Sequence, residues 1–180
     1  MKRKISVVVL IAAVAAVVAT AAAFAVSGGE LPADRTSGHI VIQGVEGGDP
    51  GSTSIAVESW SLGLTSSATF GGGGGGAGKA ILKEQTITKT IDKASPVLAR
   101  KCAQGLHIPE VVLTVDRPGG SGRPYMEYRL TEVIINSVQQ AGNGSSIPLE
   151  EVSFVFHTIQ LTYTTRDGVV VQTEIEDPDA

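Results

Sequence analysis

The residues that come nearest to a chemical motif are a run of glycines followed by a lysine. Gly73 to Lys79 fits the pattern G-x-x-x-x-G-K, in which backbone amides cradle a phosphate chain and the lysine neutralises it. The next residue is Ala80, where such a loop needs Ser or Thr to hold magnesium, and the following residues alternate like a strand. Six consecutive glycines also match any glycine motif by chance. We therefore expect no nucleotide and no other cofactor to bind here.

The second candidate is a thiol nucleophile. Cys102 is the only cysteine of the chain, and His107 follows it closely enough to be considered as its base. No third group that could orient the histidine is evident, so we interpret Cys102 as a small buried apolar residue. His39, His107 and His157 lack the spacing of metal ligands. The sequence predicts no catalytic residue and no metal site, and hence a protein that is not an enzyme.

Acidic residues form two groups that could suggest glycoside hydrolysis or calcium binding. Glu150 and Glu151 are adjacent, and Glu174, Glu176 and Asp177 lie near the end of the chain. Adjacent or alternating acids near strand ends usually belong to a solvated face, which is our interpretation of both groups. Aromatic residues make up only 4% of the chain, so no platform for sugars or bases stands out.

The elements that must hold these residues are predicted to be mainly strands. Short runs rich in Val, Ile and Thr are separated by Gly, Pro, Asp and Asn from His39 onward. We expect a first strand that begins at His39, a second from Ile55 to Leu64 and a third from Ala80 to Thr90. Further strands are expected after His107, from Tyr125, before Tyr163 and after Gly168. With about eight strands, we expect a small antiparallel β-barrel of two packed sheets.

One short α-helix interrupts the strands. Ser95 followed by Pro96 has the form of an N-cap with proline at the first helical position, and Gly105 stands where a helix ends. A helix of about nine residues is predicted. In the strand that precedes Tyr163, the apolar parity changes between Phe156 and Ile159, which predicts a β-bulge at His157 or Thr158.

The N-terminus has the pattern of an export segment. MKRK is followed by an almost unbroken apolar stretch from Ile5 to Val26. Residues 1–25 are therefore expected to be a signal peptide, with Ala23 and Ala25 as cleavage candidates, or an uncleaved membrane anchor. Residues 26–38 would be a polar spacer and residues 39–180 the folded domain. Without Lys2, Arg3 and Lys4 the chain has 11 basic and 18 acidic residues. The resulting formal charge of −7 argues against nucleic-acid binding.

The region from Gly71 to Pro109 resembles the haemolysin-coregulated protein (Hcp) family, the tube proteins of type VI secretion systems. The match is an ordered set: a glycine-rich loop ending in Lys79, then Thr88-Lys89, Ile91-Asp92-Lys93 and Ser95-Pro96, and finally Cys102, Gly105, His107 and Pro109. The flanks agree, with similarity to the family's opening strand at Ile40 to Gly47, to its tryptophan segment at Val57 to Ser61, and to its tyrosine-containing strand at Tyr125 to Val138. The resemblance covers roughly His39 to Tyr163.

The resemblance implies a barrel that assembles into hexameric rings, which stack into a tube and carry small effectors, with a sheath and a spike as partners. It also implies that a long loop reaches a neighbouring subunit; its residues here are Gly71, Gly72, Gly73, Gly74, Gly75, Gly76, Gly78 and Lys79. A surface loop without such a role is the alternative that glycine composition alone allows. The export segment departs from the family pattern and implies a secreted or envelope-associated protein. An exported monomeric binding module or adhesin is the alternative function.

Overall fold

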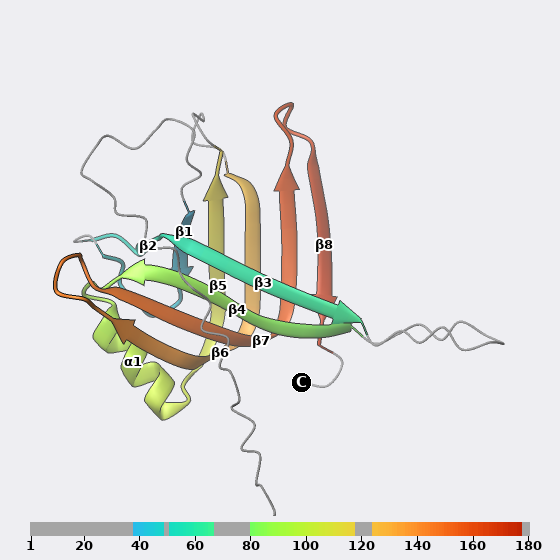
Figure 1. Cartoon of the computed structure of the whole chain (residues 1–180). Helices are drawn as coiled ribbons and strands as arrows, with labels where there is room; N and C mark the ends of the chain where they lie inside the picture. The colour runs from blue at the N-terminus through green and yellow to red at the C-terminus, as the bar shows by residue number, and fades with distance from the viewer. Residues whose placement is uncertain (1–37, 49–50, 67–79, 118–123, 178–180) are drawn as a thin grey trace, which may run out of the picture. The chain divides into compact units, whose positions relative to one another are not determined.

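The computed structural model describes residues 38–48, 51–66, 80–117 and 124–177. These residues form eight antiparallel strands and one helix (Figure 1). The elements are β1 (Gly38–Ile42), β2 (Ser54–Val57), β3 (Ser59–Ser66), β4 (Ala80–Thr90), α1 (Ser95–Gln104), β5 (His107–Asp116), β6 (Pro124–Ala141), β7 (Leu149–Thr164) and β8 (Val170–Glu176). The mainly β composition with one short helix is confirmed. Among these residues no helix is both long and apolar enough to span a bilayer.

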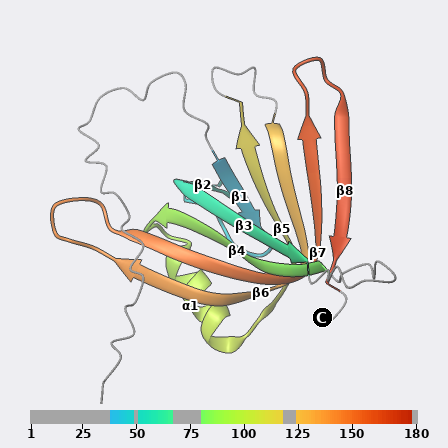
Figure 2. The same ribbon diagram turned by 45° about the vertical axis from the view of Figure 1, so that its right-hand side comes forward.

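All strands belong to one sheet, in the order β2-β1-β5-β6-β7-β4-β3, with β8 paired to β7. The long strands β6 and β7 bend sharply, so that one half of the sheet lies across the other (Figures 1 and 2). Strand β7 pairs β4 through Leu149–Phe154 and β8 through Thr158–Thr164. A register shift in β6 between Ile135 and Ser137 adds to the bend, because an extra residue on one strand kinks it.

The predicted bulge at His157 or Thr158 is wrong, because the register of β7 with β6 is unbroken at these residues. The change of buried parity is nevertheless present, and it occurs at one level in three neighbouring strands. Each strand has one buried residue just before this level and one just after it: Ile108 and Val111 on β5, Leu130 and Val133 on β6, and Phe156 and Ile159 on β7. All three strands therefore change face together at this level, without an inserted residue. At this level β6 carries Glu132 with a φ of 52°.

The predicted strand from Ile55 to Leu64 is two strands. Strand β2 pairs β1, whereas β3 pairs β4, and the chain changes partner at Glu58, whose N–H donates to the carbonyl of Thr88 (2.8 Å). The change of partner is accompanied by a change of parity, because Ile55 and Val57 are the buried residues of β2, whereas Trp60 and Leu62 are the residues of β3 that pack against the core.

Helix α1 begins and ends close to the predicted positions. Pro96 lies in the first turn, but Ser95 does not cap the helix: the residue before the helix is Ala94, whose side chain makes no capping hydrogen bond. The end is as predicted: Gly105 is left-handed (φ 58°), its N–H donates to the carbonyl of Cys102, and that of Leu106 donates to the carbonyl of Lys101. This double closure is the Schellman motif.

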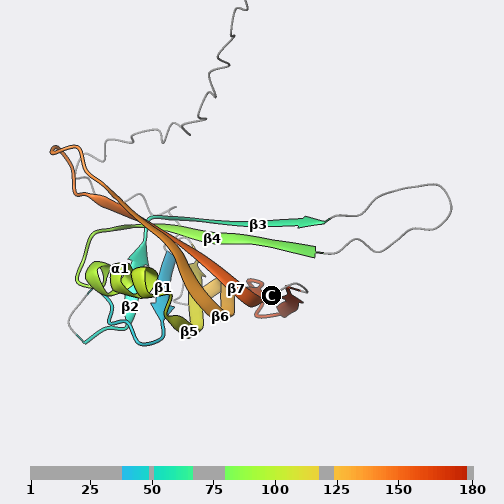
Figure 3. The ribbon, with the colours of Figure 1, turned by 90° about the horizontal axis from the view of Figure 1, so that it is seen from below.

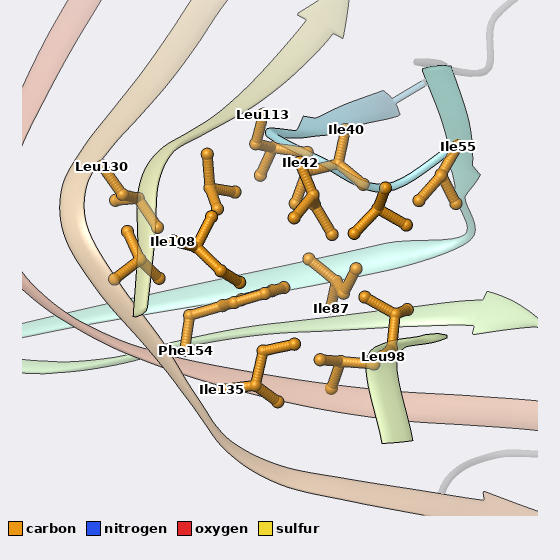
Figure 4. Packing of buried hydrophobic residues seen from close by; sticks show 14 of the residues in the cluster. Ile40, Ile42, Ile55, Ile87, Leu98, Ile108, Leu113, Leu130, Ile135 and Phe154 are labelled. Carbon is orange, nitrogen blue, oxygen red and sulfur yellow. The ribbon is translucent and has the colours of Figure 1, made fainter. Parts of the chain in front are cut away.

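The core lies between the two halves of the sheet and α1. Figure 4 shows side chains from β1, β2, β4, β5, β6, β7 and the helix pointing toward one another. Its central members are fully or almost fully buried: Ile40, Ile42, Ile55, Ile87, Leu98, Ile108, Leu113, Leu130, Ile135 and Phe154. No pairing between β2 and β3 closes the sheet within the described residues.

Candidate functional site

The predicted site residues lie outside the described residues. These are the loop residues Gly71–Gly76, Gly78 and Lys79, and the cleavage candidates Ala23 and Ala25. The structure does describe where the loop is attached: Ser66, the last residue of β3, pairs with Ala80, the first residue of β4. The loop therefore connects two strands that are held together up to their last residues.

The polar centre of the described fold is an ion cluster around Lys89, which is completely buried. Its ammonium donates to Asp92 Oδ1 (2.8 Å), to the Thr90 carbonyl (2.9 Å) and to Ser95 Oγ (3.2 Å). Glu150, also completely buried, places Oε1 3.2 Å from the ammonium. Since the three protons already have acceptors, this oxygen is ion-paired without a well-directed hydrogen bond, and it accepts none from elsewhere.

The cluster follows from sheet register and from the turn before α1. Lys89 and Glu150 are direct partners on β4 and β7, and Gln140 on β6 is the next partner, donating to Glu150 Oε2 (2.7 Å). Asp92 accepts from the N–H of Ala94 (2.9 Å), and the Asp92 N–H donates to Ser95 Oγ (3.1 Å). The cluster thus joins three strands to the start of the helix.

Burial of Glu150 corrects the expectation of a solvated face for the first acidic pair. Its neighbour Glu151 is exposed, because successive residues of a strand point to opposite faces. The second group does lie on the surface: Glu174 accepts from Gln160 Nε2 (3.4 Å), and Glu176 Oε1 is 3.0 Å from His157 Nε2. The alternation of β4 gave one signal for the cluster, because Lys89 lies on the same side of the strand as the buried Gln85 and Ile87. The signal is weak, because Ile81, Lys83 and Ile91 share that side and are exposed.

The histidines lie apart and each faces an acid on a neighbouring strand. His39 Nδ1 is 3.3 Å from Asp116 Oδ2, and His107 Nε2 is 2.5 Å from Glu132 Oε2. Cys102 is partly buried and packs against the core. In the part of the chain that the structure describes, no group of three His, Cys, Asp or Glu residues could hold a metal ion.

Arg129 organises the polar outer face of β5 and β6. It donates to Glu110 (2.6 Å) and to Glu127 (3.1 Å). The hydrogen bond to Glu110 is the main reason why the pKa of the guanidinium is raised above its ordinary value. A shallow cavity of about 260 Å³ lies where β4 and β7 separate, lined by Leu82, Lys83, Glu84, Val155, Phe156 and Asp177.

The described residues thus form a mainly β fold in which a buried ion cluster joins three strands to the start of α1. The family model described as "Type VI secretion system effector, Hcp" matches residues 34–163, well over half of the chain. The chain therefore belongs to the Hcp family, the secreted, non-enzymatic structural proteins of type VI secretion.

Individual relatives agree with this assignment. Protein hcp1 of Pseudomonas aeruginosa is 37% identical over 87 residues, which cover 47% of this chain and 54% of that protein. The matched part is thus about half of the curated relative. A type VI secretion system effector from Yersinia pestis superposes with a TM-score of 0.65 at 25% identity, over 77% of this chain and 98% of the other. Hcp1 from Salmonella typhimurium has the same fold, with a TM-score of 0.68 at 24% identity, over 80% of this chain and 96% of the other.

Proposed function

We propose that this protein forms hexameric rings that stack into a hollow tube, and that the tube carries small effector proteins in its lumen. The observation that carries the proposal is the family match over residues 34–163. A sheath and a spike would be its partners in a contractile machine, and no nucleic acid takes part. The finer fold belongs to the same proposal: the bent sheet acts as a small barrel of two packed halves, which is supported by a core drawn from both halves.

Gly71–Gly76, Gly78 and Lys79 are proposed to contact the neighbouring subunit. The support is the position of the segment, which joins the paired ends of β3 and β4 at Ser66 and Ala80. Glycine gives up the most backbone entropy when ordered, so a partner surface has to stabilise the segment. Deleting Gly71–Gly76 should weaken the ring more than the fold. Light scattering after size exclusion measures the first effect and thermal unfolding the second.

Residues 1–25 are proposed to export the chain, residues 26–38 to act as a spacer, and residues 39–180 to form the assembling domain. The mature protein would be secreted or remain at the envelope, touching the membrane only through residues 1–25 if they are not removed. Mass spectrometry of the N-terminus of protein recovered from cells tests this directly. A start shortly after Ala23 or Ala25 supports cleavage, whereas an intact N-terminus supports an anchor.

Oligomeric state decides the main proposal. Six-fold assemblies in light scattering, and rings in electron micrographs, support it. A protein that stays monomeric at high concentration contradicts it and favours the exported binding module or adhesin.

A further inference from the structure

The loop between β6 and β7 carries one of the two asparagines of the sequence, Asn143. Residues 142–148 project beyond the ends of the two strands (Figure 3), and all of them are exposed. The base of the loop is fixed, because Ala141 pairs with Leu149 and the carbonyl of Pro148 accepts from the N–H of Ile91 (3.1 Å). A chemical change at Asn143 is therefore confined to an exposed loop with anchored ends.

Asn143 is followed by Gly144, and this pair has the chemistry of spontaneous deamidation. In that reaction the backbone nitrogen of the following residue attacks the side-chain carbonyl carbon of the asparagine. A side chain on the following residue hinders the approach, and glycine has none. Gly144 has a φ of 75°, and a Cβ added to it would meet nothing within 4 Å beyond its chain neighbours. No described residue accepts a hydrogen bond from its N–H, so the attacking nitrogen is open to solvent.

The side-chain oxygen of Asn143 is the acceptor for three donors. Oδ1 accepts from the N–H of Ser145 (3.1 Å), from Ser145 Oγ (3.0 Å) and from Ser146 Oγ (3.0 Å). The bond from the Ser145 N–H folds the carboxamide back over the peptide group that contains the attacking nitrogen. Negative charge develops on Oδ1 when the nitrogen adds to the carbonyl carbon, and donors already aimed at this atom stabilise that charge. The loop therefore favours attack at Asn143.

We propose that Asn143 is a site of spontaneous deamidation in the folded protein, favoured by the three hydrogen bonds to its Oδ1. The Gly144 nitrogen loses its proton to solvent and forms a bond with Asn143 Cγ. The bond from Cγ to Nδ2 then breaks, and Nδ2 takes up a proton from solvent and leaves as ammonia. Water opens the resulting succinimide ring at one of its two carbonyls and gives aspartate or isoaspartate. Each event adds one negative charge to the loop, and isoaspartate also adds one carbon to the backbone path.

Two other positions of the chain serve as internal comparisons. Asn136 is the second asparagine; its Nδ2 donates to Glu84 Oε1 (2.7 Å), and the residue that follows it lies within β6. Asp167 precedes Gly168, which has a φ of 84° and equally open surroundings, but an ionised carboxylate is a poor electrophile. Only the asparagine of the β6–β7 loop combines the amide, the glycine and the donors.

Mass spectrometry of the full chain, aged in mildly alkaline buffer, tests the proposal. Both asparagines lie on one tryptic peptide, residues 130–166, whose fragments report each position separately. Aspartate and isoaspartate should accumulate at Asn143 while Asn136 stays unchanged. Gly144→Ala should slow the reaction by more than about tenfold, because a methyl group beside the attacking nitrogen displaces the reacting atoms. The matched control is Gly168→Ala, which adds the same methyl to a glycine of similar conformation and should leave the rate at Asn143 unchanged.

A second variant tests the part of the structure that favours attack. Ser146→Ala removes one donor to Oδ1 without changing a glycine, so the folded variant should react about fivefold more slowly, the equivalent of one net hydrogen bond. In guanidinium chloride this variant and wild type should react at equal rates, because an unfolded chain does not hold the donors in place. Thermal unfolding in plain buffer checks that each variant is folded.

Four outcomes overturn the proposal. Persistence of Asn143 in the folded protein, with loss only in guanidinium chloride, would mean that the fold protects the site. Equal rates at Asn136 and Asn143 would remove the role of the loop, and a folded Ser146→Ala variant as fast as wild type would remove the role of the donors. The sequence Asn143-Gly144-Ser145 also fits the acceptor pattern of N-glycosylation, so a sugar on Asn143 Nδ2 in protein recovered from cells is the fourth.

Discussion

Replacing Lys89 by methionine should destabilise the fold strongly, because the change leaves Glu150 buried without its counter-charge. Glu150 would retain only the hydrogen bond from Gln140 (2.7 Å), in a site with no solvent exposure. Breaking a buried ion pair by removing one partner costs about 3–5 kcal/mol. For a domain of this size each kcal/mol lowers Tm by about 2–4 °C, so the loss should be on the order of 10 °C.

The double variant Lys89→Met, Glu150→Leu separates the loss of the pair from the loss of a side chain. Replacing a buried pair by apolar residues of similar volume is often neutral, so the double variant should recover most of the lost stability. Lys93→Met is the control for removing a lysine from the same turn, since Lys93 is partly exposed and lies 3.6 Å from the exposed Glu46. Its cost should stay below about 1 kcal/mol.

Urea unfolding followed by circular dichroism measures all three free energies of unfolding. The reasoning is refuted if Lys89→Met costs no more than the Lys93 control. It is also refuted if the double variant is less stable than Lys89→Met alone, because Glu150 would then contribute something other than an unpaired charge.

Three further substitutions test the fold, each by the change in Tm and in the urea midpoint. Gly47→Ala should cost about 1–3 kcal/mol, because a Cβ there would lie 2.2 Å from the backbone oxygen of Ser54; no measurable loss would mean that the two segments can separate freely. Gly105→Ala should cost about 1–2 kcal/mol at its φ of 58°, with open space around the added methyl, and a stabilised variant would contradict the left-handed helix end. Leu98→Ala removes a fully buried side chain between α1 and the sheet and should cost about 2–5 kcal/mol, so a loss below 1 kcal/mol would place the helix outside the core.

Local patterns in the sequence identified most of the secondary structure. Ala80–Thr90 is a strand with the predicted bounds, and the helix ends at Gly105 because only a left-handed residue closes it there. The prediction that Gly73 to Lys79 is not a nucleotide loop used local chemistry alone, and its one described premise is that Ala80 begins a strand. The ordered residues between Gly71 and Pro109 were sufficient to indicate the family that the comparisons then showed.

The features that the sequence could not predict depend on which strands pair with each other. The burial of Lys89 and Glu150 is a consequence of their pairing across β4 and β7, and no local pattern reveals a partner some 60 residues away. The change of parity between Phe156 and Ile159 is visible in the sequence, but it is shared by three paired strands in unbroken register, so a bulge in one strand was the wrong explanation. Likewise, Val170 and Leu64 look like core residues in the sequence, and only the order of strands shows that they lie at free edges. Alternation along one strand reports which residues share a face, whereas the tertiary structure decides what, if anything, covers that face.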